Sequence, residues 1–70
     1  MSGKVFRHYK GGLYTVLFEA QDATNRADRD EMVVYVSHTT GKIYCRLNVE
    51  FFDLAEVNGK YVKRFERVVA

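Results

Sequence analysis

Three short stretches of the sequence combine arginine with aromatic residues, and they are the first candidates for a functional site. A guanidinium group binds a carboxylate or phosphate through paired hydrogen bonds, and aromatic rings stack on a planar ligand. We therefore predict that the chain binds a small anionic or nucleotide-like ligand. The candidate ligand-binding residues are Arg7, His8, Tyr9, Lys10, Tyr14, Tyr44, Arg46, Arg64 and Phe65.

A structural role for the same arginines stays open. Arginine stems often cover apolar surface while the charged group stays in water. In the alternation of a strand, Arg46 falls between Cys45 and Leu47, and Arg64 precedes Phe65. We therefore expect both arginines to point away from the apolar face, and we expect Cys45 to be a small buried hydrophobic residue.

The remaining reactive side chains do not form a catalytic or metal-binding pattern. Ser37 and His38 are neighbours in sequence, so they would lie on opposite faces of a strand and could not form a dyad. His8, His38 and Cys45 match none of the zinc spacings. The acidic run at 28–31 lacks the glycine and distal glutamate of a calcium loop. The glycine turns do not form a phosphate-binding loop. We expect no enzymatic activity, no metal and no cofactor.

Composition favours a single small binding domain over residues 1–70. The chain has 70 residues, 47% hydrophobic and 29% charged, which is typical of a folded globular domain. So small a core leaves little stability for a catalytic cleft. The single cysteine suits a reducing cytoplasm, and no apolar run is long enough to span a membrane. A net charge of +2 does not require a polyanionic partner, so nucleic acid binding stays open.

The order of apolar runs and turns predicts an all-β fold. Gly11-Gly12 is typical of a hairpin turn, and Asn58-Gly59 is the strongest hairpin dipeptide in the chain. A polar loop is expected at 21–31, with one helical turn around Ala23–Ala27. Strands are expected at Val5–Tyr9, Leu13–Ala20, Met32–His38, Ile43–Leu47, Ala55–Val57 and Tyr61–Val68.

The stretch Asn48–Phe52 is the one expected departure from strand structure. Leu47, Phe51 and Leu54 recur at helical spacing, and Asn48 is a good helix N-cap, so we predict a short helical or 3₁₀ turn there. Five or six short strands in so short a chain would hide their edges best in a small SH3-like barrel. We therefore predict an all-β SH3-like barrel.

The sequence also resembles that of a known protein family, most clearly in the first expected strand and the turn after it. The run Arg-His-Tyr-Lys-Gly-Gly-Leu-Tyr-Thr-Val-Leu at 7–17 resembles the signature of a small family of bacterial and phage proteins, domain of unknown function 1653. Further matches are Val33-Val34-Tyr35, Arg46 with Phe51, and Gly59-Lys60-x-Val62-x-Arg64-Phe65. The chain departs from that pattern at Leu47 and Lys63, where relatives have proline, and in the loop after Ala20. The resemblance implies a compact β domain and brings no assigned activity.

Two functions follow from these observations. The first is a non-catalytic domain that binds a small ligand, such as a phage-type protein that sequesters an anionic, nucleotide-like molecule. A homo-oligomer would help such a domain, since a short chain encloses a pocket most easily between subunits. The alternative is an adaptor that binds protein or nucleic acid across the face of the barrel, and a steep salt dependence of affinity would mark the nucleic acid version.

Overall fold

The computed structural model describes residues 3–24 and 31–69, and it confirms an all-β chain with one short helix. The elements are β1 (Val5–His8), β2 (Leu13–Gln21), β3 (Glu31–Ser37), β4 (Ile43–Leu47), α1 (Asn48–Phe51), β5 (Leu54–Val57), β6 (Lys60–Lys63) and β7 (Phe65–Arg67). The helical turn expected around Ala23–Ala27 and the acidic run at 28–31 lie largely outside the described residues.

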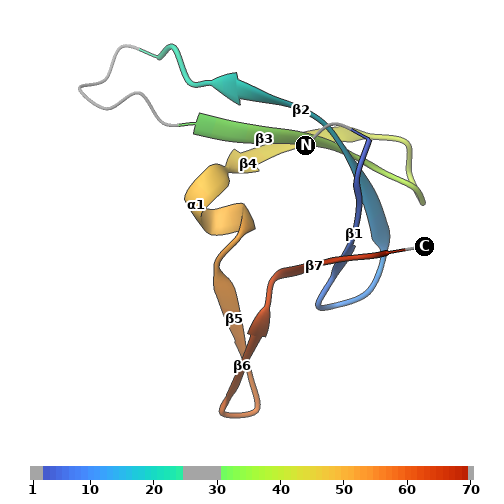
Figure 1. Cartoon of the computed structure of the whole chain (residues 1–70), viewed down its shortest axis with the longest axis vertical. Helices are drawn as coiled ribbons and strands as arrows, with labels where there is room; N and C mark the ends of the chain where they lie inside the picture. The colour runs from blue at the N-terminus through green and yellow to red at the C-terminus, as the bar shows by residue number, and fades with distance from the viewer. Residues whose placement is uncertain (1–2, 25–30, 70) are drawn as a thin grey trace.

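The strands form two antiparallel sheets rather than a closed barrel. The larger sheet has the order β4-β3-β2-β1-β7, and β5 pairs with β6 alone. Figure 1 shows the β5–β6 hairpin extending away from the larger sheet. The predicted barrel closure was therefore wrong, because the hairpin strands pair with each other and leave β4 and β7 as edges.

The last predicted strand is divided between the two sheets. Tyr61–Val68 was expected to be continuous, but the chain leaves the strand conformation at Arg64. The Arg64 N–H donates to the carbonyl of Asp53, 3.1 Å away, at the base of the hairpin, and the Arg64 carbonyl accepts from the Tyr9 N–H at 2.9 Å. This residue therefore links the hairpin to β1. The break at Arg64 brings the number of strands in the described residues to seven, above the predicted five or six.

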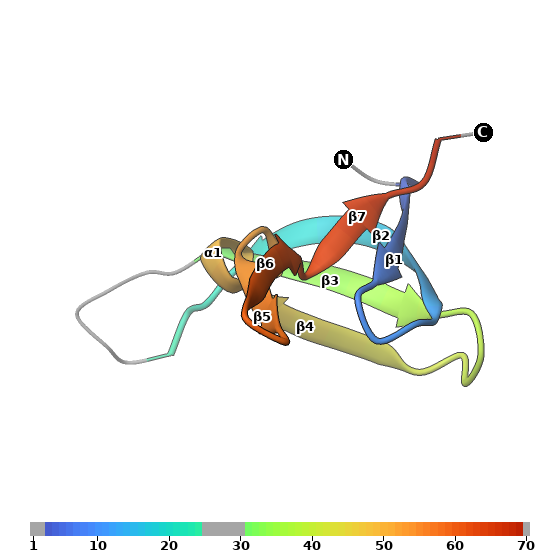
Figure 2. The ribbon, with the colours of Figure 1, turned by 90° about the horizontal axis from the view of Figure 1, so that it is seen from below.

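The core lies between the larger sheet and the segment that follows β4. Figure 2 shows α1 and the β5–β6 hairpin on the same side of β3 and β4. The core residues are Phe6, Val16, Val33, Tyr35, Phe51 and Phe65, with Tyr14 packed against them. Phe51 is fully buried, and its ring stacks on that of Phe65 with centroids 4.1 Å apart and an interplanar angle of 4°. Burial of one aromatic ring therefore explains why the chain makes a helical turn at this point.

The predicted helical turn is confirmed, although its start differs from the expectation. Leu47 occupies the N-cap position and makes no side-chain capping bond, whereas Asn48 is the first helical residue. The Asn48 side-chain amide instead donates to Glu19 Oε1 at 3.0 Å, which ties α1 to β2. The Asn48 side chain, which was expected to cap the helix, therefore makes a tertiary hydrogen bond instead.

The face of β4 that points into the core was also predicted wrongly. Register pairs Arg46 with Val33 and Tyr44 with Tyr35, and both β3 residues belong to the core. Cys45 lies on the opposite face and is exposed. The expected buried role of Cys45 is therefore incorrect, because strand alternation alone does not say which face is covered.

The Asn58-Gly59 hairpin is confirmed, and it gives a test of the fold. Both residues have positive φ, 51° and 79°, as a two-residue type I′ turn requires. Apart from Gly59 itself and its two chain neighbours, no heavy atom of the described residues lies within 4 Å of the position a Cβ at Gly59 would take. Backbone strain rather than collision will therefore decide the effect of a substitution.

We expect Gly59→Val to lower the free energy of unfolding by more than about 1 kcal/mol, because a β-branched residue is strained at positive φ. Gly59→Asn is the matched control, since asparagine tolerates this conformation, and it should cost less. Chemical denaturation followed by circular dichroism measures both variants. An unchanged unfolding midpoint for Gly59→Val would contradict the role of this turn.

Candidate functional site

Aromatic side chains gather on the core-facing side of the larger sheet and leave a small cavity at its surface. This cavity, called here the aromatic pocket, has a volume of about 230 Å³. Its lining residues are His8, Tyr14, Tyr35, Tyr44, Arg46 and Phe65, which come from five strands. The pocket is therefore built by the whole sheet and not by one loop.

Strand register explains why these rings meet. His8 pairs with Phe65 across β1 and β7, and Tyr35 pairs with Tyr44 across β3 and β4. Tyr14 lies between the two pairs, with its ring centroid 5.6 Å from Tyr35 and 5.7 Å from Phe65. Directly opposed residues share a face of a sheet. The pairing of the strands therefore places all five rings on the same face of the larger sheet.

Arg46 is the fixed cation of the aromatic pocket. Its guanidinium lies 5.6 Å from the centroid of the Phe65 ring, within the range of a cation–π interaction. Its Nε–H donates to the Tyr35 hydroxyl at 3.4 Å, and its Nη1 pairs with Glu50 Oε1 at 3.0 Å. Contacts on β3, β7 and α1 therefore hold the charged group at the pocket, where a ligand would meet it already oriented.

His8 forms the wall opposite Arg46 and is held as a neutral ring. The backbone N–H of Lys10 donates to His8 Nδ1 at 3.1 Å, so the neutral ring carries its proton on Nε2. Burial lowers the pKa of His8 below its ordinary value, and the positive charges of Arg46, Lys10 and Arg64 lower it further. Three cations therefore act at this wall of the pocket, which favours an anion there.

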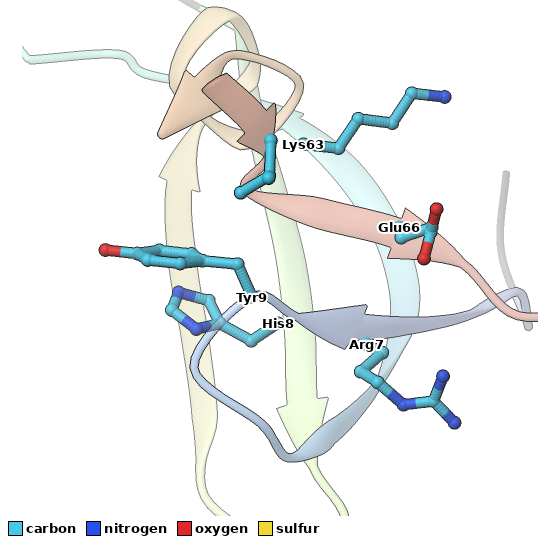
Figure 3. A pocket seen from close by; sticks show the side chains of 6 residues that line it. Arg7, His8, Tyr9, Lys63 and Glu66 are labelled. Carbon is cyan, nitrogen blue, oxygen red and sulfur yellow. The ribbon is translucent and has the colours of Figure 1, made fainter. Parts of the chain in front are cut away.

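A second cavity, called here the lateral pocket, lies on the other side of His8. It has a volume of about 320 Å³ and is lined by Arg7, His8, Tyr9, Val62, Lys63 and Glu66. Figure 3 shows the His8 and Tyr9 rings side by side, while Arg7 and Lys63 extend from β1 and β6 on either side of Glu66. The carboxylate of Glu66 offsets part of this positive charge, as Glu50 does for Arg46 in the aromatic pocket, so the two pockets differ mainly in their ring walls.

The structure brings most of the predicted site residues together. His8, Tyr14, Tyr44, Arg46 and Phe65 line the aromatic pocket, whereas Arg7 and Tyr9 line the lateral pocket. Lys10 lies with Nζ 5.7 Å from the centroid of the Tyr9 ring, and Arg64 Nε donates to the Glu50 carbonyl at 3.1 Å. Neither Lys10 nor Arg64 lines the aromatic pocket or the lateral pocket, so each acts on the site through its charge or through a neighbouring residue.

Two features of the site differ from the sequence prediction. Arg46 was expected to point away from the apolar face, but its side chain lies over the Phe65 ring. Tyr35 was not among the candidates, although it is a pocket residue and only 4% exposed. Its register with Tyr44 is the signal that identifies it, and that register is not visible until strands are paired.

The other reactive side chains take structural roles. Ser37 is buried, and its Oγ accepts the backbone N–H groups of Thr39 and Thr40 at 3.2 Å in the following turn. His38 is exposed, and its Nε2 lies 2.7 Å from the hydroxyl of Thr15. Within 3–24 and 31–69, no group of three His, Cys, Asp or Glu side chains could hold a metal ion.

In the same residues, no helix is long and apolar enough to cross a membrane.

The fold and pocket define a small all-β domain whose concave face carries an aromatic pocket with a fixed arginine. Comparison with known proteins places it in a family: residues 4–67 match the proteins of unknown function grouped as DUF1653, and the chain belongs to that family. No curated protein and no solved structure matches the chain. The resemblance noted at 7–17 is thereby confirmed.

The lowered pKa of His8 gives a test of the pocket's environment. The folded-state pKa lies below the ordinary value of 6.5, so the unfolded chain takes up a proton first as the pH falls. The free energy of unfolding is therefore highest above about pH 6.5, where the His8 ring is neutral, and it decreases as the pH falls from there through the lowered pKa.

We expect the wild-type chain to lose more stability than His8→Gln between about pH 7.5 and about pH 5. Urea denaturation at the two pH values measures the difference, and an NMR titration of the His8 ring gives the pKa directly. The same loss of stability in both proteins, with His8 titrating at its ordinary value, would contradict the positive environment of the pocket.

Proposed function

We propose that this chain is a non-catalytic domain that binds a small, planar, anionic ligand in the aromatic pocket. The observation that carries the proposal is the position of Arg46 at a cavity walled by aromatic rings. The rings offer stacking surfaces to a planar group, and the guanidinium offers a carboxylate or phosphate the N–H donors that Tyr35 and Glu50 do not use. Tyr44, which is 41% exposed, is the ring most open to stacking.

The size of the pocket limits the ligand. A cavity of about 230 Å³ filled at the usual packing density of about 0.75 holds roughly 170 Å³ of atoms. That volume suits one planar ring system with an acid group, such as a nucleobase-like acid. A sugar and phosphate would extend beyond it, and the lateral pocket adjoins it across His8.

The charge of the pocket selects against a cation. Aromatic cages also bind quaternary ammonium groups, through the negative faces of their rings. Here Arg46, Lys10 and Arg64 all act on His8 with positive charge, and a ligand cation would be repelled. The same cations attract an anion. The proposal is therefore a nucleotide-like acid and not a methylated amine.

A binding domain without catalytic groups suits sequestration of a signalling molecule. A phage-type protein in the bacterial cytoplasm could remove an anionic, nucleotide-like signal simply by holding it. This role rests on the chemistry of the pocket together with the family's occurrence, and fold alone does not assign it.

Native mass spectrometry of freshly purified protein tests for a ligand that copurifies, and calorimetry with adenosine monophosphate and with orotate tests the chemical class. We expect Arg46→Ala to weaken binding of the better probe by about 10- to 150-fold, since charge-assisted hydrogen bonds contribute about 1.5–3 kcal/mol. Arg67→Ala is the matched control, because Arg67 is exposed and lines neither pocket. Circular dichroism checks that both variants fold.

Two outcomes would remove the proposal. The first is that Arg46→Ala binds the probe as tightly as wild type does. The second is that neither probe shifts the NMR signals of the pocket residues. A steep fall of oligonucleotide affinity with salt would instead favour the adaptor that binds nucleic acid, because phosphate contacts release counterions.

A further inference from the structure

The face of the larger sheet opposite the aromatic pocket, called here the convex or outer face, is apolar over three rows of residues that are exposed or part-exposed. Register places its outward residues in three rows across the strands. They are Val5, Thr15, Val36 and Ile43 in the first row, Phe18, Val34 and Cys45 in the second, and Ala20, Met32 and Leu47 in the third. None of these residues is charged. Ile43 is 64% exposed and Phe18 is 54% exposed.

An antiparallel sheet that faces water on one side normally alternates apolar and polar residues. Here β3 is apolar on both faces over most of its length, because Val33 and Tyr35 face the core while Val34 and Val36 face outward. Solvation therefore does not account for the residue types on the outer face, whereas a partner sheet would.

We propose that the outer face of the larger sheet binds the same face of a second copy of this chain, forming a back-to-back dimer. Such a contact is isologous, so an uncharged apolar surface meets an identical one under twofold symmetry. Two antiparallel sheets packed in this way form the two layers of a β-sandwich about 10 Å apart. The contact would be made by β1, β2, β3 and β4.

The area of the face suits a weak dimer, because its apolar rows supply less than half of what a standard interface takes from each partner. Strands about 4.8 Å apart and rows about 7 Å apart give the ten residues of the three rows a plane of about 340 Å². A standard interface takes about 800 Å² from each partner and has an apolar centre within a polar rim. Arg7 and Glu66 pair across β1 and β7 beside the first row and supply part of such a rim.

Charge also favours the back-to-back arrangement. The chain carries a net charge of +2, so two copies repel each other when their positive surfaces meet. The cations that act on His8 are associated with the aromatic pocket on the opposite face. Association through the uncharged face keeps the two positive sites far apart and leaves the aromatic pocket of each copy open. The dimer is therefore independent of the proposed ligand.

Sedimentation equilibrium from about 10 µM to about 1 mM tests the dimer. We expect a monomer–dimer equilibrium in the wild-type chain. Ile43→Lys should raise the dissociation constant by about tenfold or more, because a lysine would be buried unpaired at the contact. Val49→Lys is the control, since Val49 is 76% exposed on α1 and lies off the outer face, so this variant should dimerise as wild type does.

A second measurement separates loss of the contact from loss of the fold. Dilution of wild-type protein should shift the amide NMR signals of the outer-face residues and leave those of the aromatic pocket in place. A chain that stays monomeric at every concentration would overturn the proposal, as would a dimer that Ile43→Lys leaves unchanged. Either result leaves ligand binding by Arg46 untouched, because the two tests use different faces.

Discussion

The stacking of Phe51 on Phe65 is the contact on which the rest of the structure depends. One ring comes from α1 and the other from β7, and their centroids are 4.1 Å apart with the planes 4° from parallel. Phe51 also meets the edge of Phe6 and lies 5.4 Å from Tyr35, so one fully buried ring joins the helical turn to three strands. In so short a chain, a buried aromatic residue supplies a large share of the apolar surface removed from water.

The same packing produces the aromatic pocket. Phe65 is held by Phe51 and has Arg46 5.6 Å from its ring centroid. Arg46 is held in turn by Glu50, the residue next to Phe51 on α1. The core contact and the candidate binding residue are therefore mechanically linked, so the guanidinium is preorganised without a deep cleft. Preorganisation lowers the entropy lost on binding, which matters most for a small shallow site.

The two faces of the larger sheet differ in chemistry, and this division organises the proposed functions. The concave face carries the rings, the arginine and the positive field at His8. The convex face carries three rows of uncharged residues. A sheet that remains open rather than closing into a barrel keeps both faces available. The open architecture therefore allows a ligand site and a protein contact in a chain of 70 residues.

Local features could be predicted from the amino-acid sequence: the Asn58-Gly59 turn, the strand positions before it, the helical turn at α1 and most residues of the candidate site. Each depends on backbone preference or on residue type, which nearby residues settle. Strand pairing was needed to show that Arg46 faces the core while Cys45 does not, that Tyr35 joins the pocket and that the final strand divides at Arg64. Alternation has a period of two and fits either face of a strand, so only the register with β3 shows which face of β4 is buried. The break in the final strand likewise depends on the hydrogen bonds that Arg64 makes with distant residues.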